Sequence, residues 1–305
     1  MHSESKRLSL VAAAALVVVS AVWGSTFFII KDLVSIIPPL DFLGVRFFLA
    51  GAIIAIFRIG SLLRVNWRVW RRGMILGLIY GLAQVCQTIG LGYTHASVSG
   101  FISATYVVLT PVVLFALFRT RIPPITWLAV FLATVALGVL SLQGLSAGTG
   151  ERITFIGALF YALHIALMGY WAPKGNQVEL GTIQLITLGI FCTICASGGG
   201  IVLPSGGKQW CQMLYMVIFA AVLAIVTQTW AQSHISATAT ALILTTEPFF
   251  AAAFAIAFGG ERFTFRLALG GALMIIAMVV SEIGPKCSYS WNKWRNSKAA
   301  AKQSV

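Results

Sequence analysis

The chain is 305 residues long, and 59% of these residues are hydrophobic while only 10% are charged. Its mean hydropathy is +0.92. Soluble domains contain roughly 45–50% apolar and about 25% charged residues, so the composition excludes a soluble fold. The net charge of +13 raises the question of a nucleic-acid partner, which the positions of the 21 Lys and Arg decide.

Apolar runs, separated by short connectors, fill the chain almost from end to end. A bilayer core about 30 Å thick requires roughly 20 helical residues at about 1.5 Å each, and every run is long enough to cross it. The runs are continuous, which excludes the alternating pattern of a membrane β-barrel. The sequence therefore predicts an all-α integral membrane protein with ten transmembrane helices. The predicted spans are 8–30, 39–59, 71–91, 97–118, 122–141, 151–171, 180–203, 209–230, 237–258 and 265–283.

The Lys and Arg residues are distributed unevenly among the connectors. If the N-terminus is cytoplasmic, fifteen of the 21 fall in cytoplasmic segments and five outside, and Arg46 lies within a span. The positive-inside rule then places both termini in the cytoplasm. We expect the protein to lie in the inner or plasma membrane of the cell. The predicted cytoplasmic ends are residues 1–7 and the basic tail 284–305. The basic charge therefore reports topology, and we expect no nucleic-acid partner.

The chain divides at a stretch rich in glycine and small polar residues near 142–150. Five predicted spans lie on each side, in segments 8–142 and 151–283. Because the number of spans per half is odd, homologous halves would enter the membrane in opposite senses, as an inverted repeat.

A recurring order of residues supports homology of the halves. The His-to-Pro spacings are 16 and 14 residues, and the His-to-Arg spacings are 26 and 28. The order is His95, Ser97, Pro111 and Arg121 in the first half, and His234, Ser236, Pro248 and Arg262 in the second.

Three short motifs accompany these residues. They are Trp23-Gly-Ser-Thr-Phe27 in the first span, Glu247-Pro248 in the ninth, and Gly260-Glu-Arg262 before the tenth. Together with the ten spans and the midpoint break, they make the chain resemble the EamA family of the drug/metabolite transporter (DMT) superfamily over residues 8–283. The resemblance implies two inverted five-helix EamA repeats that move small metabolites, often outward, without ATP. The first half departs from the pattern, with Thr120-Arg121 where the second has Glu261.

Ionisable side chains within the predicted spans are costly in lipid and mark candidate functional positions. Glu247 precedes Pro248, where a kinked helix either presents the carboxylate to a central cavity or uses it to cap neighbouring backbone. Arg46, near Asp41 in the second span, is either a snorkelling anchor or a cavity group. His164 in the sixth span is either a neutral histidine bonded to another helix or a proton- or substrate-linked group.

Amide side chains recur in corresponding spans of the two halves. Gln84 and Gln87 lie in the third span, and Gln228 and Gln232 in the eighth. Spacings of three and four residues place each pair on one helix face. Interhelical hydrogen bonds, or water and substrate in a shared cavity, would satisfy these amides, and we favour the cavity.

Two aromatic residues and a glycine stripe complete the candidate positions. Trp23, with Gly24, Ser25 and Thr26 in the outer half of the first span, is a candidate for stacking on a ligand. Tyr106 is one of the polar side chains of the fourth span. Gly73, Gly77 and Gly81 repeat at every fourth position of the third span, which predicts close helix packing and not ligand binding.

Motifs of other membrane-protein classes are nearly absent from the sequence. It contains no H-E-x-x-H and no G-x-x-x-x-G-K-[ST], and its one G-x-S-x-G match, Gly144-Leu-Ser-Ala-Gly148, falls in the glycine-rich stretch between the halves. Neither an enzyme nor an ATP-driven pump is therefore indicated. Cys192 and Cys195 form a C-x-x-C without a second Cys or His pair nearby, so we expect packing and no bound metal or cofactor.

We therefore predict a secondary transporter that exports small organic metabolites or drug-like solutes by alternating access. The expected partners are a small-molecule substrate and the lipid bilayer, and a homodimer is left open. A membrane-embedded enzyme and a non-transporting interaction protein are the alternatives. Amino acids, nucleobases, amines and drug-like cations all remain open as substrates.

Overall fold

A computed structural model describes residues 2–119, 124–143, 146–171, 177–232 and 243–280 of the chain. Nearly all of these residues are helical, as the apolar runs predict. The elements are α1 (His2–Val34), α2 (Pro39–Leu62), α3 (Trp67–Leu91), α4 (Ala96–Ser103), α5 (Tyr106–Phe118), α6 (Pro124–Ser141), the short strands β1 (Leu142–Gln143) and β2 (Ser146–Ala147), α7 (Thr149–Trp171), α8 (Gln177–Ala196), the 3-10 turn η2 (Ser197–Gly199), α9 (Gly207–Val217), the π-helix η3 (Ile218–Leu223), α10 (Ala224–Gln232), α12 (Glu247–Ala257) and a final helix over Phe265–Val280.

Six helical segments in the described part of the chain are long and apolar enough to cross a membrane. Three shorter apolar helices accompany them: Pro124–Leu140, Glu247–Ala257 and Phe265–Val280. The protein is therefore a multi-pass membrane protein, while the full number of ten crossings stays a prediction.

Helix breaks interrupt two of the predicted spans at matching places in the two halves. In the first half, a turn at Ala104-Thr105 separates α4 from α5. In the second half, a turn at Thr245-Thr246 precedes α12, whose first two residues are Glu247 and Pro248. Proline is suited to the first turn of a helix, where its missing N–H leaves no hydrogen bond unmade. The chain thus bends just before Glu247, as Pro248 predicts.

The glycine stripe of α3 packs directly against α8, which confirms the predicted close contact. A Cβ added to Gly77 would lie 2.7 Å from both the Gln184 carbonyl oxygen and the Thr187 Cβ. The neighbouring glycines are equally confined, with Gly73 against Ile183 and Gly81 against Phe191. The backbones of α3 and α8 approach closely because no side chain separates them.

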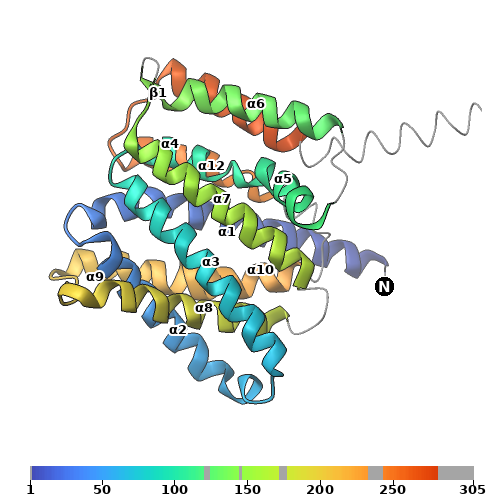
Figure 1. Ribbon diagram of the computed structural model, residues 1–305, viewed down its shortest axis with the longest axis vertical. Coiled ribbons are helices and arrows are strands. Elements are labelled where there is room, and N and C mark those ends of the chain that lie inside the picture. The colour runs from blue at the N-terminus through green and yellow to red at the C-terminus, as the bar shows by residue number, and fades with distance from the viewer. Residues whose placement is uncertain (1, 120–123, 144–145, 172–176, 233–242, 281–305) are drawn as a thin grey trace, which may run out of the picture.

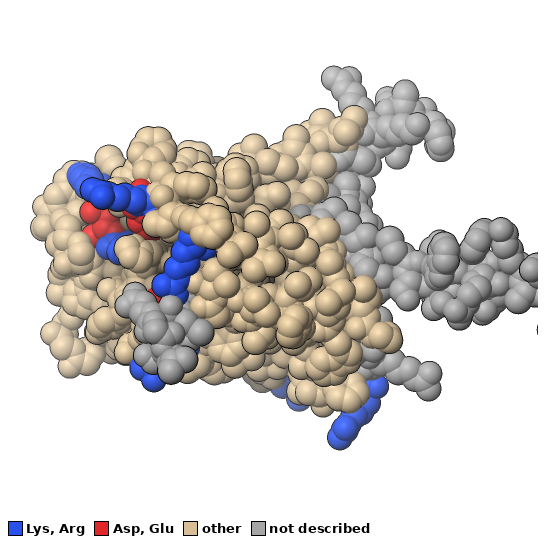
Figure 2. All heavy atoms as spheres, turned by 90° about the horizontal axis from the view of Figure 1, so that it is seen from above, with Lys and Arg blue, Asp and Glu red and all other residues tan. Residues whose placement is uncertain are grey.

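The helices lie side by side along one direction, so that their ends gather at two ends of the bundle (Figure 1). At the top of Figure 1, α6 and the final helix pack through small and apolar residues such as Ala133, Leu140 and Met274. At the bottom, α2 lies against α8. We call the end at which α1 finishes and α4, α7 and α9 begin the pocket end, at the left of Figure 1. Acidic and basic side chains gather there, and uncharged residues cover most of the middle of the face seen in Figure 2.

The close approach of α3 and α8 leads to a stability prediction. Gly77→Ala places a methyl group against the α8 backbone, so we expect the protein to lose about 1–3 kcal/mol of stability. Gly60→Ala is the matched control, because no atom lies within 4 Å of a Cβ at that helical position. Both changes raise helix propensity by about 1 kcal/mol, so their difference reports the interhelical contact. Melting temperatures of the two purified variants in detergent measure it, and equal values would contradict the prediction.

Candidate functional site

A network of amide and tyrosine side chains lies inside the bundle, where α3, α4 and α7 meet. Gln87 donates a hydrogen bond from Nε2 to the Ser103 hydroxyl at 3.0 Å and accepts one from the Tyr161 hydroxyl at 2.7 Å. One turn earlier on α3, Gln84 donates from Nε2 to the Tyr80 hydroxyl at 3.0 Å. Gln87 is thus satisfied by neighbouring helices, whereas the Oε1 of Gln84 is buried without a donor.

Aromatic rings extend this network along α7. The ring of Tyr161 lies 5.7 Å from that of Tyr80 and 6.1 Å from that of Tyr106, measured between centroids. His164, one turn further along α7, stacks on Tyr80 at 5.0 Å and shares a 2.7 Å hydrogen bond between its Nε2 and the Gln184 Oε1 on α8. The structure therefore gives His164 an interhelical bond and also places it beside the tyrosines. We call Tyr80, Tyr106, Tyr161 and His164 the aromatic cluster.

Two ionisable side chains flank the aromatic cluster. Arg46 on α2 is only 5% exposed, so it points into the bundle and does not snorkel to the surface. Glu247 is half-buried at the start of α12. Both side chains lie near enough to Tyr80 and Tyr161 for their charges to act on the two phenol groups.

The remaining predicted positions are less closely connected to this region. Trp23 is half-buried on α1 and donates its indole N–H to the carbonyl of Ala220 in η3 at 2.9 Å. Gln228 is half-buried in α10. Gln232 ends α10, and its side chain lies outside the described part of the structure.

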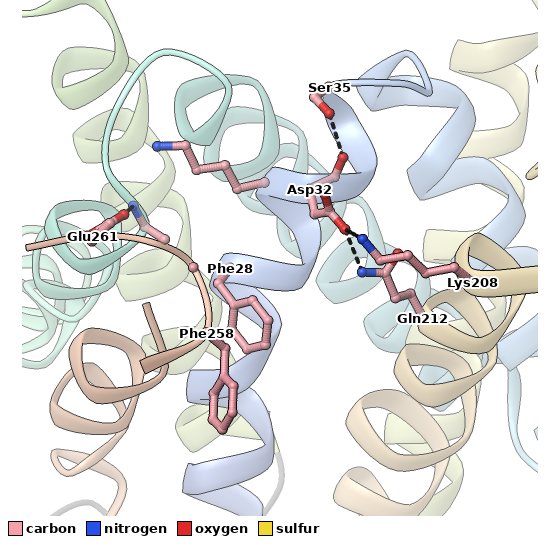
Figure 3. A pocket seen from close by; sticks show the side chains of 10 residues that line it. Phe28, Asp32, Ser35, Lys208, Gln212, Phe258 and Glu261 are labelled. Atoms are coloured by element: carbon pink, nitrogen blue, oxygen red, sulfur yellow. Dashed lines mark hydrogen bonds and ion pairs between the residues drawn. The ribbon is translucent and has the colours of Figure 1, made fainter. Parts of the chain in front are cut away.

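A pocket of about 460 Å³ opens at the pocket end between α1, α9 and the segment before the final helix (Figure 3). Asp32 lies on one wall, where it accepts hydrogen bonds from Lys208 Nζ at 2.9 Å and Gln212 Nε2 at 2.7 Å. The stacked rings of Phe28 and Phe258, 6.1 Å apart between centroids, also line the pocket. Oppositely charged groups and aromatic rings thus line one opening.

Glu261 closes the other wall of this pocket by binding the start of α4. Its carboxylate accepts the backbone N–H of Ala96 at 2.6 Å and that of Ser97 at 3.3 Å, together with the Ser97 hydroxyl. His95, at the N-cap position of α4, makes no capping bond with its own side chain. A residue far away in sequence therefore caps α4, and its negative charge also complements the helix dipole.

Sequence reasoning missed three residues of the interior region, namely Tyr80, Tyr161 and Gln184. A signal for two of them was present. Tyr80 and Gln84 are four residues apart, and Tyr161 and His164 are three apart, so each pair shares a helix face with a residue already identified.

An interior polar network within a bundle of apolar helices is typical of membrane proteins that conduct or carry polar solutes. The sequence profile of the EamA-like transporter family matches the chain twice, at residues 10–142 and 149–282. The chain belongs to this family, and thus to the drug/metabolite transporter superfamily, and it contains two family repeats.

Curated relatives and a solved structure agree with this assignment. An uncharacterized transporter of Archaeoglobus fulgidus is 29% identical over 269 residues, which cover 88% of this chain and 84% of the relative. The uncharacterized inner membrane transporter YedA of Escherichia coli K12 is 23% identical over 279 residues, 86% of this chain and 88% of the relative. A crystal structure with 16% identity has the same fold, with a TM-score of 0.64 over 89% of this chain and 96% of that one.

Proposed function

We propose that the protein is a secondary transporter that exports small organic solutes by alternating access between two inverted repeats. The single observation that carries the proposal is the pair of ionisable side chains, Arg46 and Glu247, beside the aromatic cluster inside the helix bundle of a chain from a transporter family. Groups of this kind are costly in an apolar bundle unless a solute or water contacts them. The proposed cavity positions are Trp23, Arg46, Gln84, Gln87, Tyr106, His164, Gln228, Gln232 and Glu247.

Helix contacts support an inverted relation of the repeats, here taken as 8–142 and 151–283. The contact of α1 with α12 has a counterpart in the contacts of α7 with α4 and α5, as expected if α1 corresponds to α7. The pair α2 with α8 joins corresponding helices of the two halves, and the pair α4 with α12 joins parts of the corresponding spans 97–118 and 237–258. A pseudo-two-fold axis in the membrane plane accounts for such reciprocal contacts.

Solute flux in liposomes tests the proposal directly. The purified protein is reconstituted into vesicles loaded with a bacterial metabolite extract, and mass spectrometry of the external medium identifies what leaves. We expect a subset of small organic solutes to be released faster than from empty liposomes. Turnover of a covalent bond without any flux would instead favour the alternative of a membrane enzyme. A deletion strain that accumulates the same solutes would establish the direction of transport.

We also propose that residues 1–7 and 284–305 are cytoplasmic in the inner or plasma membrane, which puts the pocket end outside. Ile36→Cys at the pocket end and Leu63→Cys at the opposite end test this orientation, because both side chains are exposed, at 56% and 82%. In a variant without native cysteines, an impermeant maleimide added to intact cells should label position 36 and spare position 63. After the cells are opened, both positions should react, which controls for folding. Labelling of position 63 in intact cells would reverse the orientation.

A further inference from the structure

Arg46 is a buried guanidinium without a counter-charge in the described part of the chain. Its Nε is fully buried and has no acceptor. Asp41, the nearest acidic residue on α2, accepts the backbone N–H of Val202 at 2.9 Å and makes no ion pair with Arg46. The guanidinium carbon lies 4.7 Å from the ring centroid of its neighbour Phe47, a contact weaker than an ion pair. A buried charge requires a counter-charge or acceptors, so Arg46 is available to an anionic group.

Glu247 is the complementary case on α12. It takes part in none of the ion pairs or hydrogen bonds found among the described residues, although it is half-buried in an apolar bundle. The carboxylates of Asp32, Glu151, Glu179 and Glu261, by contrast, all have hydrogen-bond donors. Glu247 is therefore available to a cationic group.

The aromatic cluster lies near both of these charged residues. Tyr80 and Tyr161 come within electrostatic range of both Arg46 and Glu247, yet the two ionisable residues form no ion pair with each other. In Figure 1, α2 lies at the lower edge of the bundle and α12 in its upper half, with α3 and α7 between them. An anion-binding and a cation-binding group thus lie on different helices, and both are near the tyrosines of the aromatic cluster.

We propose that the solutes carried by this protein are zwitterions, with the anionic group bound by Arg46 and the cationic group by Glu247. This inference rests on the proposed transport function and narrows its substrate class. The aromatic cluster contacts the body of the solute, and its tyrosine faces add attraction for the cationic group. A solute with only one charge leaves the other protein charge buried and unpaired, and is selected against for that reason.

Flux from loaded liposomes tests the proposal with four probes that share one aromatic body. Phenylalanine and 4-(aminomethyl)benzoate carry both charges, at short and long separations, whereas 2-phenylethylamine carries only the positive and 3-phenylpropanoate only the negative charge. All four are added to a bacterial metabolite extract inside the vesicles. After the leak of each probe from protein-free liposomes is subtracted, we expect the released solutes to be zwitterions and each singly charged probe to leave at least about tenfold more slowly than the best zwitterion.

Single variants assign the two charges. Arg46→Gln should slow release of zwitterions by about tenfold or more and should not slow 2-phenylethylamine, since that probe does not use the guanidinium. Glu247→Gln should slow zwitterions equally and should not slow 3-phenylpropanoate. Arg71→Gln, at an exposed position of α3, controls for loss of a positive charge. Preferential release of singly charged or neutral solutes would overturn the zwitterion proposal, whereas no release of any solute would overturn transport itself.

Discussion

Glu247→Gln should abolish most solute flux while leaving the amount and thermal stability of the protein unchanged. The substitution nearly preserves the shape of the side chain and removes its charge. Because no described residue bonds to this carboxylate, little native structure depends on it. A hydrogen bond to a charged group contributes about 1.5–3 kcal/mol, so the initial rate of release at low solute concentration should fall about ten- to hundredfold.

The matched control is Glu179→Gln. Glu179 is also a largely buried carboxylate in the first turn of a helix. It differs in forming an ion pair with Arg58 at 2.5 Å, at the end of the bundle opposite the pocket end. We expect this variant to retain most of its flux. Normal flux in Glu247→Gln at equal abundance would show that the carboxylate has only a local structural role, which is the alternative that Pro248 also permits.

Glu261→Ala should open the pocket end of the bundle. The substitution removes the acceptor for two backbone N–H groups and one hydroxyl at the start of α4. Loss of a helix cap costs about 1–2 kcal/mol, which corresponds to about a five- to thirtyfold larger population of conformations in which α4 is released. In a transporter with alternating access, this change favours the state that is open at the pocket end.

Ser99→Cys on α4 is a suitable reporter for this opening. Its side chain is fully buried and its hydroxyl has no partner, so a thiol replaces it with little disturbance. In a cysteine-free background, maleimide should label this position about five- to thirtyfold faster when Glu261→Ala is present. Glu179→Ala, at the opposite end, should leave the labelling rate unchanged. Equal rates with and without Glu261 would contradict a closing role for that residue.

Much of the fold could be predicted because long apolar runs have few structural solutions in lipid. Helix breaks within the runs were harder to locate. Ala104-Thr105 and Thr245-Thr246 lie within apolar surroundings, and hydropathy does not register a local change of backbone direction. Only Pro248 gave a direct signal, because its ring and missing N–H favour the start of a helix.

The hydrogen-bond partners of side chains on different helices were harder to predict from the sequence than the positions of the helices along the chain. Asp41 lies close to Arg46 in sequence, yet its carboxylate accepts an N–H from Val202, which follows α8. Glu261 was identified from a family motif, but its capping of α4 depends on two segments more than 160 residues apart. The amides divide in the same way. Gln87 bonds to Ser103 and Tyr161, so the interhelical alternative describes it in this structure, while Gln84 keeps a free acceptor.

The π-helix η3 has a consequence for how the two repeats correspond. A π-turn accommodates one more residue than an α-turn, so the chain beyond Leu223 is rotated by about 100° relative to an uninterrupted helix. Its counterpart, α3, is a continuous α-helix in the first half. A residue-by-residue superposition that is in register at the start of these two spans is therefore out of register at their ends. The second repeat carries the equivalent of a single-residue insertion, at the segment where Ala220 accepts the indole N–H of Trp23. The symmetry between the repeats is therefore broken along one helix and not only at single side chains.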